Sequence, residues 1–183
     1  MPLHYVAPLH YAGLLTIAAT VAAPVAAQQP ATPRPSQRGS VMQRVGDTRI
    51  EILYSRPVAR GRELFGTVVP WGRPWNPGAD TATQVTFSDD VRVNGERLAA
   101  GTYSLWAIPG RETWTVIFSR AAPVWHVPYP GRDKDALRLE VRSETGCHME
   151  TLAYYFPVVD GLRAVLHLHW GTTIVPLELR MEQ

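Results

Sequence analysis

The sequence predicts an all-β protein, an antiparallel β-sandwich or jelly-roll-like barrel of eight to nine short strands. Three observations support this prediction. Short runs of β-branched and aromatic residues alternate with polar residues, turn-forming glycine and proline separate these runs, and no stretch keeps a sustained helical period. Short strands at close spacing, mostly joined as hairpins, are typical of sandwiches and barrels rather than of parallel sheets.

The first predicted hairpins lie in the middle of the chain. Residues 84–88 alternate, and the strand at 91–93 leads into Asn94-Gly95, a pair that suits a two-residue hairpin turn because both positions need a positive φ. Residues 101–108 and 113–118 then flank Pro109-Gly110-Arg111-Glu112, which predicts a second hairpin.

The last third of the chain continues this pattern. Residues 136–142 place leucine and valine on one face and charged residues on the other, as a half-buried antiparallel strand does. Strands at 151–158 and 162–170 are expected to join across Val159-Asp160-Gly161. We expect Trp170-Gly171-Thr172 to turn into a last strand at 173–179.

The N-terminal segment is predicted to direct export. Residues 9–27 carry no charge and end in Val25-Ala26-Ala27, which suits a signal peptidase, so we expect a signal peptide at 1–27. An uncleaved anchor is the alternative, since no lysine or arginine precedes the apolar run. The mature protein is then periplasmic or extracellular, with no stable membrane span after cleavage. A disordered linker, rich in proline, glutamine and serine, is expected at 28–40, and a single domain at 41–183.

Charge and cysteine content narrow the classes of function. The net charge of +2 is spread as mixed arginine, aspartate and glutamate, so no basic block predicts nucleic-acid binding. Cys147 is the single cysteine, which excludes an intramolecular disulfide. The chain also lacks the local motifs of serine hydrolases, zincins and nucleotide-binding loops.

Residues 54–80, called here the Arg/Trp loop, form the predicted binding site. The segment holds four arginines, two tryptophans, four glycines and four prolines, too many helix and strand breakers for regular structure. Guanidinium groups suit carboxylate, phosphate or sulfate, and indole faces suit sugar rings. The predicted ligand-binding residues are Arg56, Arg60, Arg62, Trp71, Trp75, Asn76 and Asp80. Alternatively, the arginines pair with Glu63, Asp80, Asp89 or Asp90, and the tryptophans cap the core.

A second candidate is the pair His167 and His169. Residues two apart on a strand point the same way, so the two imidazoles lie side by side and offer two ligands to zinc, copper or iron. A divalent metal there would need a further donor, from His126, His148, Glu150 or Asp160. The alternative is that the pair forms the polar side of an amphipathic strand.

The chain resembles the domain of unknown function 2911 family. The resemblance covers about Val41 to the C-terminus and rests on these elements in order: Tyr54-Ser55-Arg56-Pro57, Gly61-Arg62, Phe65-Gly66, Val69-Pro70-Trp71-Gly72, Trp75, Gly78-Ala79-Asp80, Ala82-Thr83, Phe87-Ser88, Leu98, Ala100-Gly101-Thr102-Tyr103-Ser104-Leu105, Ile108-Pro109-Gly110 and Trp114-Thr115-Val116-Ile117-Phe118. It implies an exported, β-rich domain and no established activity. The chain departs from the family pattern at Asn76-Pro77 and at Asp80, inside the predicted site.

These observations favour a non-catalytic module of the cell envelope that binds a saccharide or a small anionic ligand through the Arg/Trp loop. One alternative is a metal-dependent hydrolase at His167 and His169, where a bound metal would activate water. The other is a protein-interaction domain, because arginine and exposed aromatic residues are also enriched at protein interfaces.

Overall fold

The computed structural model describes residues 1–2 and 35–182, so the predicted signal peptide beyond residue 2 and most of the predicted linker lie outside the described residues. The described domain contains ten strands and one short 3₁₀ helix. The elements are β1 (Gln37–Val45), β2 (Thr48–Arg56), β3 (Gln84–Phe87), β4 (Val91–Val93), β5 (Glu96–Leu98), β6 (Gly101–Ile108), β7 (Thr113–Ser119), η1 (Arg132–Lys134), β8 (Asp135–Arg142), β9 (Glu144–Asp160) and β10 (Arg163–Met181).

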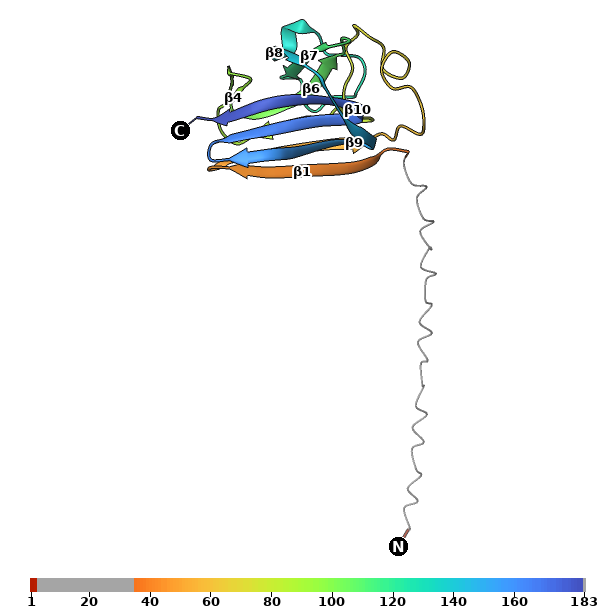
Figure 1. The fold of residues 1–183 in the computed structure, drawn as a ribbon. Helices are drawn as coiled ribbons and strands as arrows, with labels where there is room; N and C mark the ends of the chain where they lie inside the picture. The colour runs from red at the N-terminus through yellow and green to blue at the C-terminus, as the bar shows by residue number, and fades with distance from the viewer. Residues whose placement is uncertain (3–34, 183) are drawn as a thin grey trace. The chain divides into compact units, whose positions relative to one another are not determined.

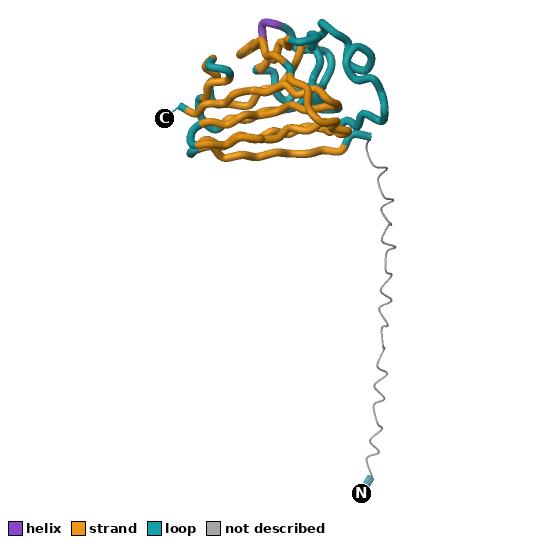
Figure 2. The backbone as a smooth tube through the Cα atoms, viewed as in Figure 1, coloured by secondary structure: helices purple, strands orange, loops and turns teal. Residues whose placement is uncertain are grey.

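The strands form two antiparallel sheets that do not close into a barrel (Figures 1 and 2). One sheet has the order β1-β2-β3-β6-β7-β8 and the other the order β5-β4-β10-β9. The all-β, sandwich-type prediction is therefore confirmed. The described residues hold ten strands rather than eight or nine, because β1 and β2 add a hairpin before the Arg/Trp loop.

Strand β1 begins at Gln37, within the segment expected to be linker. Its residues pair with β2 from Gln37 opposite Arg56 to Val45 opposite Thr48. The side chains at the start of β1 are mostly exposed, so main-chain pairing rather than burial holds these residues in the sheet. A polar segment of this kind carries no apolar signal from which a strand is predicted.

The main core lies between the two sheets. The six-stranded sheet contributes alternate residues such as Ile50, Ile52 and Phe87, and the four-stranded sheet contributes Leu166 and Leu177. The period-2 pattern of the sequence therefore marks these buried faces correctly.

The predicted turn at Asn94-Gly95 is present, with φ values of 48° and 87°, and joins β4 to β5.

The turn predicted at Trp170-Gly171-Thr172 is wrong. Strand β10 runs without a break from Arg163 to Met181, and its pairing with β9 shifts register on both sides of Gly171. Gly171 has φ 59°, and a Cβ atom there would lie 2.8 Å from Leu64 Cδ1. Glycine with positive φ serves a turn or a bulge equally well, and pairing with β9 makes this one a bulge.

A smaller core covers the outer face of the six-stranded sheet. The connection between β7 and β8 packs Tyr129 over Trp106, with ring centroids 5.4 Å apart. The Tyr129 hydroxyl donates to Asp135, and Arg138 Nη1 donates to the other Asp135 oxygen at 2.7 Å. This network holds the connection against the sheet. In contrast, Trp125 in the same connection is 55 % exposed.

The Tyr129 network predicts a stability change at high pH. Burial first, and the hydrogen bond to Asp135 second, raise the pKa of Tyr129 to about 12. An unfolded tyrosine ionises near about pH 10, so between these values the unfolded chain binds fewer protons and stability falls as pH rises. We expect the stability advantage of the wild type over Tyr129→Phe to shrink from pH 9 upward in urea titrations. The ionisation of the other tyrosines is common to both proteins and cancels in this comparison. A difference in unfolding free energy that stays constant with pH would contradict the raised pKa of Tyr129.

Candidate functional site

The Arg/Trp loop is an ordered connection that contains no helix or strand after β2 ends at Arg56. Isolated bridges tie it to both sheets, from Val58 to Thr151 in β9 and from Trp75 to Ala107 in β6. The Trp75 and Ala107 main chains exchange two hydrogen bonds of 2.8 Å. The prediction of a structured loop is confirmed, and its anchors define which side chains point inward.

The arginines of the loop bond mainly to main-chain carbonyl groups. Arg62 donates from Nε to Ala59 O at 2.8 Å and from Nη2 to Val58 O at 2.7 Å. Arg56 Nε reaches Leu152 O at 3.4 Å, and Arg60 Nη2 reaches Pro35 O at 3.2 Å.

Two of the carboxylates considered as arginine partners are engaged elsewhere. Glu63 accepts a hydrogen bond from Thr67, and Asp90 pairs with Arg97 of β5 at 2.7 Å. Among the described residues no carboxylate forms an ion pair with Arg62, which bonds main-chain carbonyl groups, so its charge remains available to a ligand.

Trp75 belongs to the aromatic core rather than to an open surface. Its ring stacks on Trp170 with centroids 6.0 Å apart and an interplanar angle of 15°. Phe65 and Trp114 meet it edge-on at 6.0 and 6.3 Å. For this tryptophan, the structure supports the alternative that the loop caps the core.

Asn76 is also structural. It is 2 % exposed, and both ends of its amide bond the main chain. Nδ2 donates to Leu105 O at 2.6 Å, and Oδ1 accepts from Thr83 N at 3.2 Å. The amide joins the loop to β6, and its burial keeps it from contact with a ligand.

Asp80 anchors a different part of the chain. It has φ 60°, and its carbonyl oxygen accepts from His126 N at 3.0 Å and from His126 Nδ1 at 2.7 Å. Asp80 therefore fixes the connection between β7 and β8, which covers the second core. His126 is held there as well.

One cleft gathers part of the predicted set. We call it the Arg62–Trp71 cleft; it has a volume of about 350 Å³ and is lined by Arg62, Leu64, Phe65, Trp71, His148, Trp170, Gly171, Thr172 and Thr173. Of the seven predicted ligand-binding residues, only Arg62 and Trp71 line it. Sequence reasoning missed Phe65, His148 and Trp170 as site residues, because β9 and β10 bring the latter two to the loop from far along the chain.

The cleft combines aromatic surface with positive charge. Trp71 lies 6.1 Å from Phe65 between ring centroids, and Arg111 Cζ lies 5.2 Å from the Trp71 ring, so a second guanidinium stands beside the cleft. Arg62 uses two of the five N–H groups of a guanidinium in its bonds to Ala59 and Val58, and the other three have no partner among the described residues. These N–H groups are suited to an anion or to sugar hydroxyls.

His148 is held at the cleft by Glu150. His148 Nε2 and Glu150 Oε2 lie 2.9 Å apart, and Glu150 Oε1 accepts from Arg60 N at 2.6 Å. The hydrogen bond from His148, followed by that from Arg60, lowers the pKa of Glu150. Arg60 thus acts on the cleft through its main chain, whereas its guanidinium points to Pro35 O.

The second candidate pair, His167 and His169, is joined by a tyrosine. The Tyr155 hydroxyl lies 3.0 Å from His169 Nδ1 and 3.2 Å from His167 Nδ1, and His169 Nε2 lies 3.0 Å from Cys147 O. A carbonyl only accepts, so neutral His169 carries its proton on Nε2. Tyr155 then donates to His169 Nδ1 and accepts from His167 Nδ1–H.

These tautomers determine which histidine nitrogens are available to bind a metal. Both nitrogens of His169 are engaged, and only His167 Nε2 keeps an open lone pair. Burial, the largest cause, lowers the pKa of His167 and so favours the neutral ring. Among residues 35–182, no group of three or more histidine, cysteine, aspartate or glutamate side chains gathers as a metal site. Three of the four predicted third donors have other partners: His148 and Glu150 bond each other, and His126 bonds Asp80.

The fold and the cleft define a class of protein: a two-sheet antiparallel β domain with an aromatic, arginine-bearing cleft beside a long ordered loop. The family model for the protein of unknown function DUF2911 matches residues 36–179, and the chain belongs to this family. No curated protein and no solved structure matched the chain. In the described part of the chain, no helix has the length and apolar character needed to cross a membrane.

Proposed function

We propose that this protein is an exported, non-catalytic module that binds a saccharide or a small anionic ligand in the Arg62–Trp71 cleft. The single observation that carries the proposal is the meeting of unused guanidinium N–H groups and aromatic rings in one cleft of about 350 Å³. Clefts of this size that bring aromatic side chains together with a few polar groups are typical ligand sites. Export is proposed from the uncharged run at 9–27.

The Trp170 indole supports this proposal. Trp170 is 3 % exposed, and its Nε1 is buried without a hydrogen-bond partner among the described residues. A buried donor left unpaired costs about 1–3 kcal/mol, and native proteins rarely leave one without a purpose. A ligand oxygen that reaches this N–H from the cleft would recover that energy on binding.

A binding role fits the cleft better than a catalytic one. Hydrolysis by acid–base chemistry needs a positioned acid and base or an activated nucleophile. Among the residues that line the cleft, His148 is the only histidine, and no carboxylate lines it. His148 is hydrogen-bonded to Glu150, and the rest of the lining offers a guanidinium, hydroxyl groups and ring faces, which suit binding.

The proposal is tested by a binding panel on the mature protein. The panel contains oligosaccharides with uronic acids, their neutral counterparts, and inorganic sulfate and phosphate. We expect the protein to bind an acidic saccharide or an anion. Trp71→Ala should bind it at least about tenfold more weakly, since stacking on an aromatic side chain contributes about 1–3 kcal/mol. Arg62→Gln should lower the affinity for acidic ligands more than the affinity for neutral ones.

Trp125→Ala is the matched control, because Trp125 is more than half exposed and does not line the cleft. It should leave affinity unchanged. Binding that Trp125→Ala weakens as much as Trp71→Ala, or a panel that yields no ligand, would overturn the proposal.

A further inference from the structure

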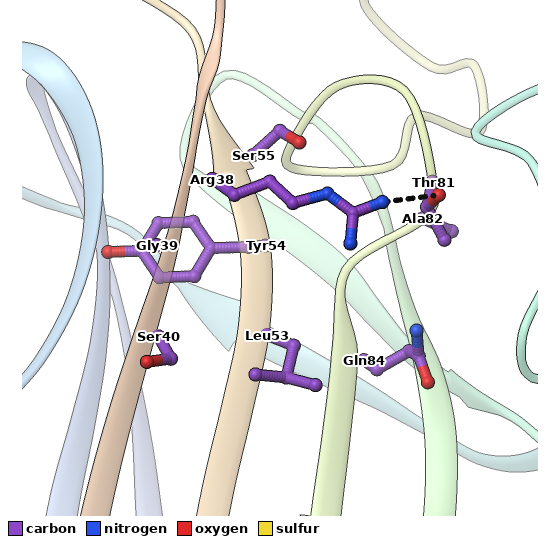
Figure 3. Close-up of a pocket in the computed structure, with 9 residues that line it drawn as sticks. All are labelled: Arg38, Gly39, Ser40, Leu53, Tyr54, Ser55, Thr81, Ala82 and Gln84. Carbon is purple, nitrogen blue, oxygen red and sulfur yellow. Dashed lines mark hydrogen bonds between the residues drawn. The ribbon is translucent and has the colours of Figure 1, made fainter. Parts of the chain in front are cut away.

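We propose a second binding site, independent of the Arg62–Trp71 cleft, for a small amphipathic monocarboxylate such as an N-acyl amino acid. The site is a pocket of about 400 Å³ where β1 and β2 meet the chain that enters β3, called here the β1–β2 pocket. It is lined by Arg38, Gly39, Ser40, Leu53, Tyr54, Ser55, Thr81, Ala82 and Gln84 (Figure 3).

Strand register builds the pocket as two rows of side chains. Arg38 lies opposite Ser55, and this pair forms the first row. In the second row Leu53 lies between Ser40 of β1 and Gln84 of β3, its register partners on either side (Figure 3). Two residues along a strand span about 7 Å, so the rows stand one small molecule apart.

The first row carries a positive charge that is available to a ligand. The Arg38 side chain reaches across β2, and its Nη2 lies 3.4 Å from Thr81 Oγ1, at the long limit of a hydrogen bond (Figure 3). No described carboxylate forms an ion pair with Arg38. Its planar fork matches a carboxylate, which accepts two parallel N–H bonds.

Ser55 lies opposite Arg38 in the first row and lines the pocket. Its side chain makes no hydrogen bond to any described residue, so the hydroxyl can donate to a ligand in the pocket. A carboxylate oxygen held by Arg38 is suited to accept from it.

The second row selects the rest of the ligand. Leu53 is 45 % exposed and offers apolar surface, while Ser40 and Gln84 offer neutral hydrogen-bonding groups on both sides of it. No acidic residue lines the pocket, so the ammonium of a free amino acid would have no partner there. An acylated nitrogen instead presents an amide that Ser40 and Gln84 bond.

The test is titration of the full chain with N-acetyl-L-leucine, followed by NMR of the Leu53 methyl groups and the Gln84 side-chain amide. We expect these signals to shift with a Kd of about 1 mM or tighter. N-acetyl-L-leucinamide, which lacks the carboxylate, and L-leucine, which adds an ammonium, should bind at least about tenfold more weakly, because an ionised hydrogen-bond partner contributes about 1.5–3 kcal/mol.

Two variants locate the charge. Arg38→Gln should lower the affinity for N-acetyl-L-leucine at least about tenfold. Arg44→Gln, an exposed arginine on the same face of β1 outside the pocket, should leave binding unchanged. Equal binding of the acid and the amide, equal loss in both variants, or no shift of the Leu53 and Gln84 signals would overturn the proposal. None of these results involves Trp71 or Arg62, so the two sites are judged separately.

Discussion

Trp75→Ala is expected to lower the free energy of unfolding by about 3 kcal/mol, the lower end of the usual cost of truncating a core tryptophan, because Trp75 is half-buried and packs against the core. Trp75 stacks on Trp170 and meets Phe65 and Trp114 edge-on, so its removal opens a cavity at the centre of the aromatic cluster. The substitution keeps the main-chain bonds to Ala107, and the loss therefore reports side-chain packing.

Trp71→Ala is the matched comparison for this prediction. Both tryptophans belong to the Arg/Trp loop and are half-buried, but Trp75 packs among three aromatic rings whereas only Trp71 lines the cleft. In denaturant unfolding, Trp71→Ala should lower the free energy of unfolding by no more than about 1–2 kcal/mol. At the same time it should weaken ligand binding in the cleft. Equal stability losses for the two substitutions would show that the loop does not separate packing from binding in this way.

Asn76→Asp is expected to destabilise the protein by at least about 3 kcal/mol, although it changes the shape of the side chain very little. The amide nitrogen that donates to Leu105 O becomes an oxygen, so two acceptors face each other where a bond of 2.6 Å existed. The new carboxylate would also be nearly fully buried, and the hydrogen-bond partners of Asn76 are main-chain groups that carry no positive charge.

The pH dependence of this variant identifies the cause. Burial raises the folded-state pKa of the new carboxyl group above its unfolded value of about 3.9, so the penalty is complete at neutral pH and shrinks as the pH falls and the group is protonated. A protonated carboxyl can donate to Leu105 O again. Urea unfolding at pH 7 and pH 4 should therefore show a smaller deficit relative to the wild type at pH 4.

Asn94→Asp is the control for this substitution. Asn94 Oδ1 accepts from Glu178 N in an exposed turn, and an aspartate keeps that acceptor. Its cost should stay below about 1 kcal/mol at both pH values. A neutral effect of Asn76→Asp, or a deficit that does not change with pH, would contradict the bonding assigned to the buried amide.

These two predictions divide the Arg/Trp loop by function. Trp75 and Asn76 fasten it to β6 and to the core, while Arg62 and Trp71 reach the cleft. The loop is therefore both architecture and a candidate binding surface, at different residues a few positions apart. Mutations in the first group test folding, and mutations in the second group test recognition.

Much of the fold was predictable because strand signals are local. The strands at Gly101–Ile108 and Thr113–Ser119, and the Asn94-Gly95 turn, depend on neighbours in sequence, and the structure confirms each. The bulge at Gly171 was not predictable, because its glycine fits a turn equally well and pairing with β9 decides between them. The polar start of β1 was missed for the same reason, since it is held by main-chain bonds to β2.

The sequence alone determined the all-β class, the family and the place of the unusual loop, since composition, period and motif order along the chain encode all three. Only the tertiary structure decided which loop side chains face a cleft, that Trp170 and His148 join Arg62 there, and that Tyr155 joins His167 to His169. The reason is that a binding site is made by residues distant in sequence, whose meeting depends on sheet register and on the path of the loop.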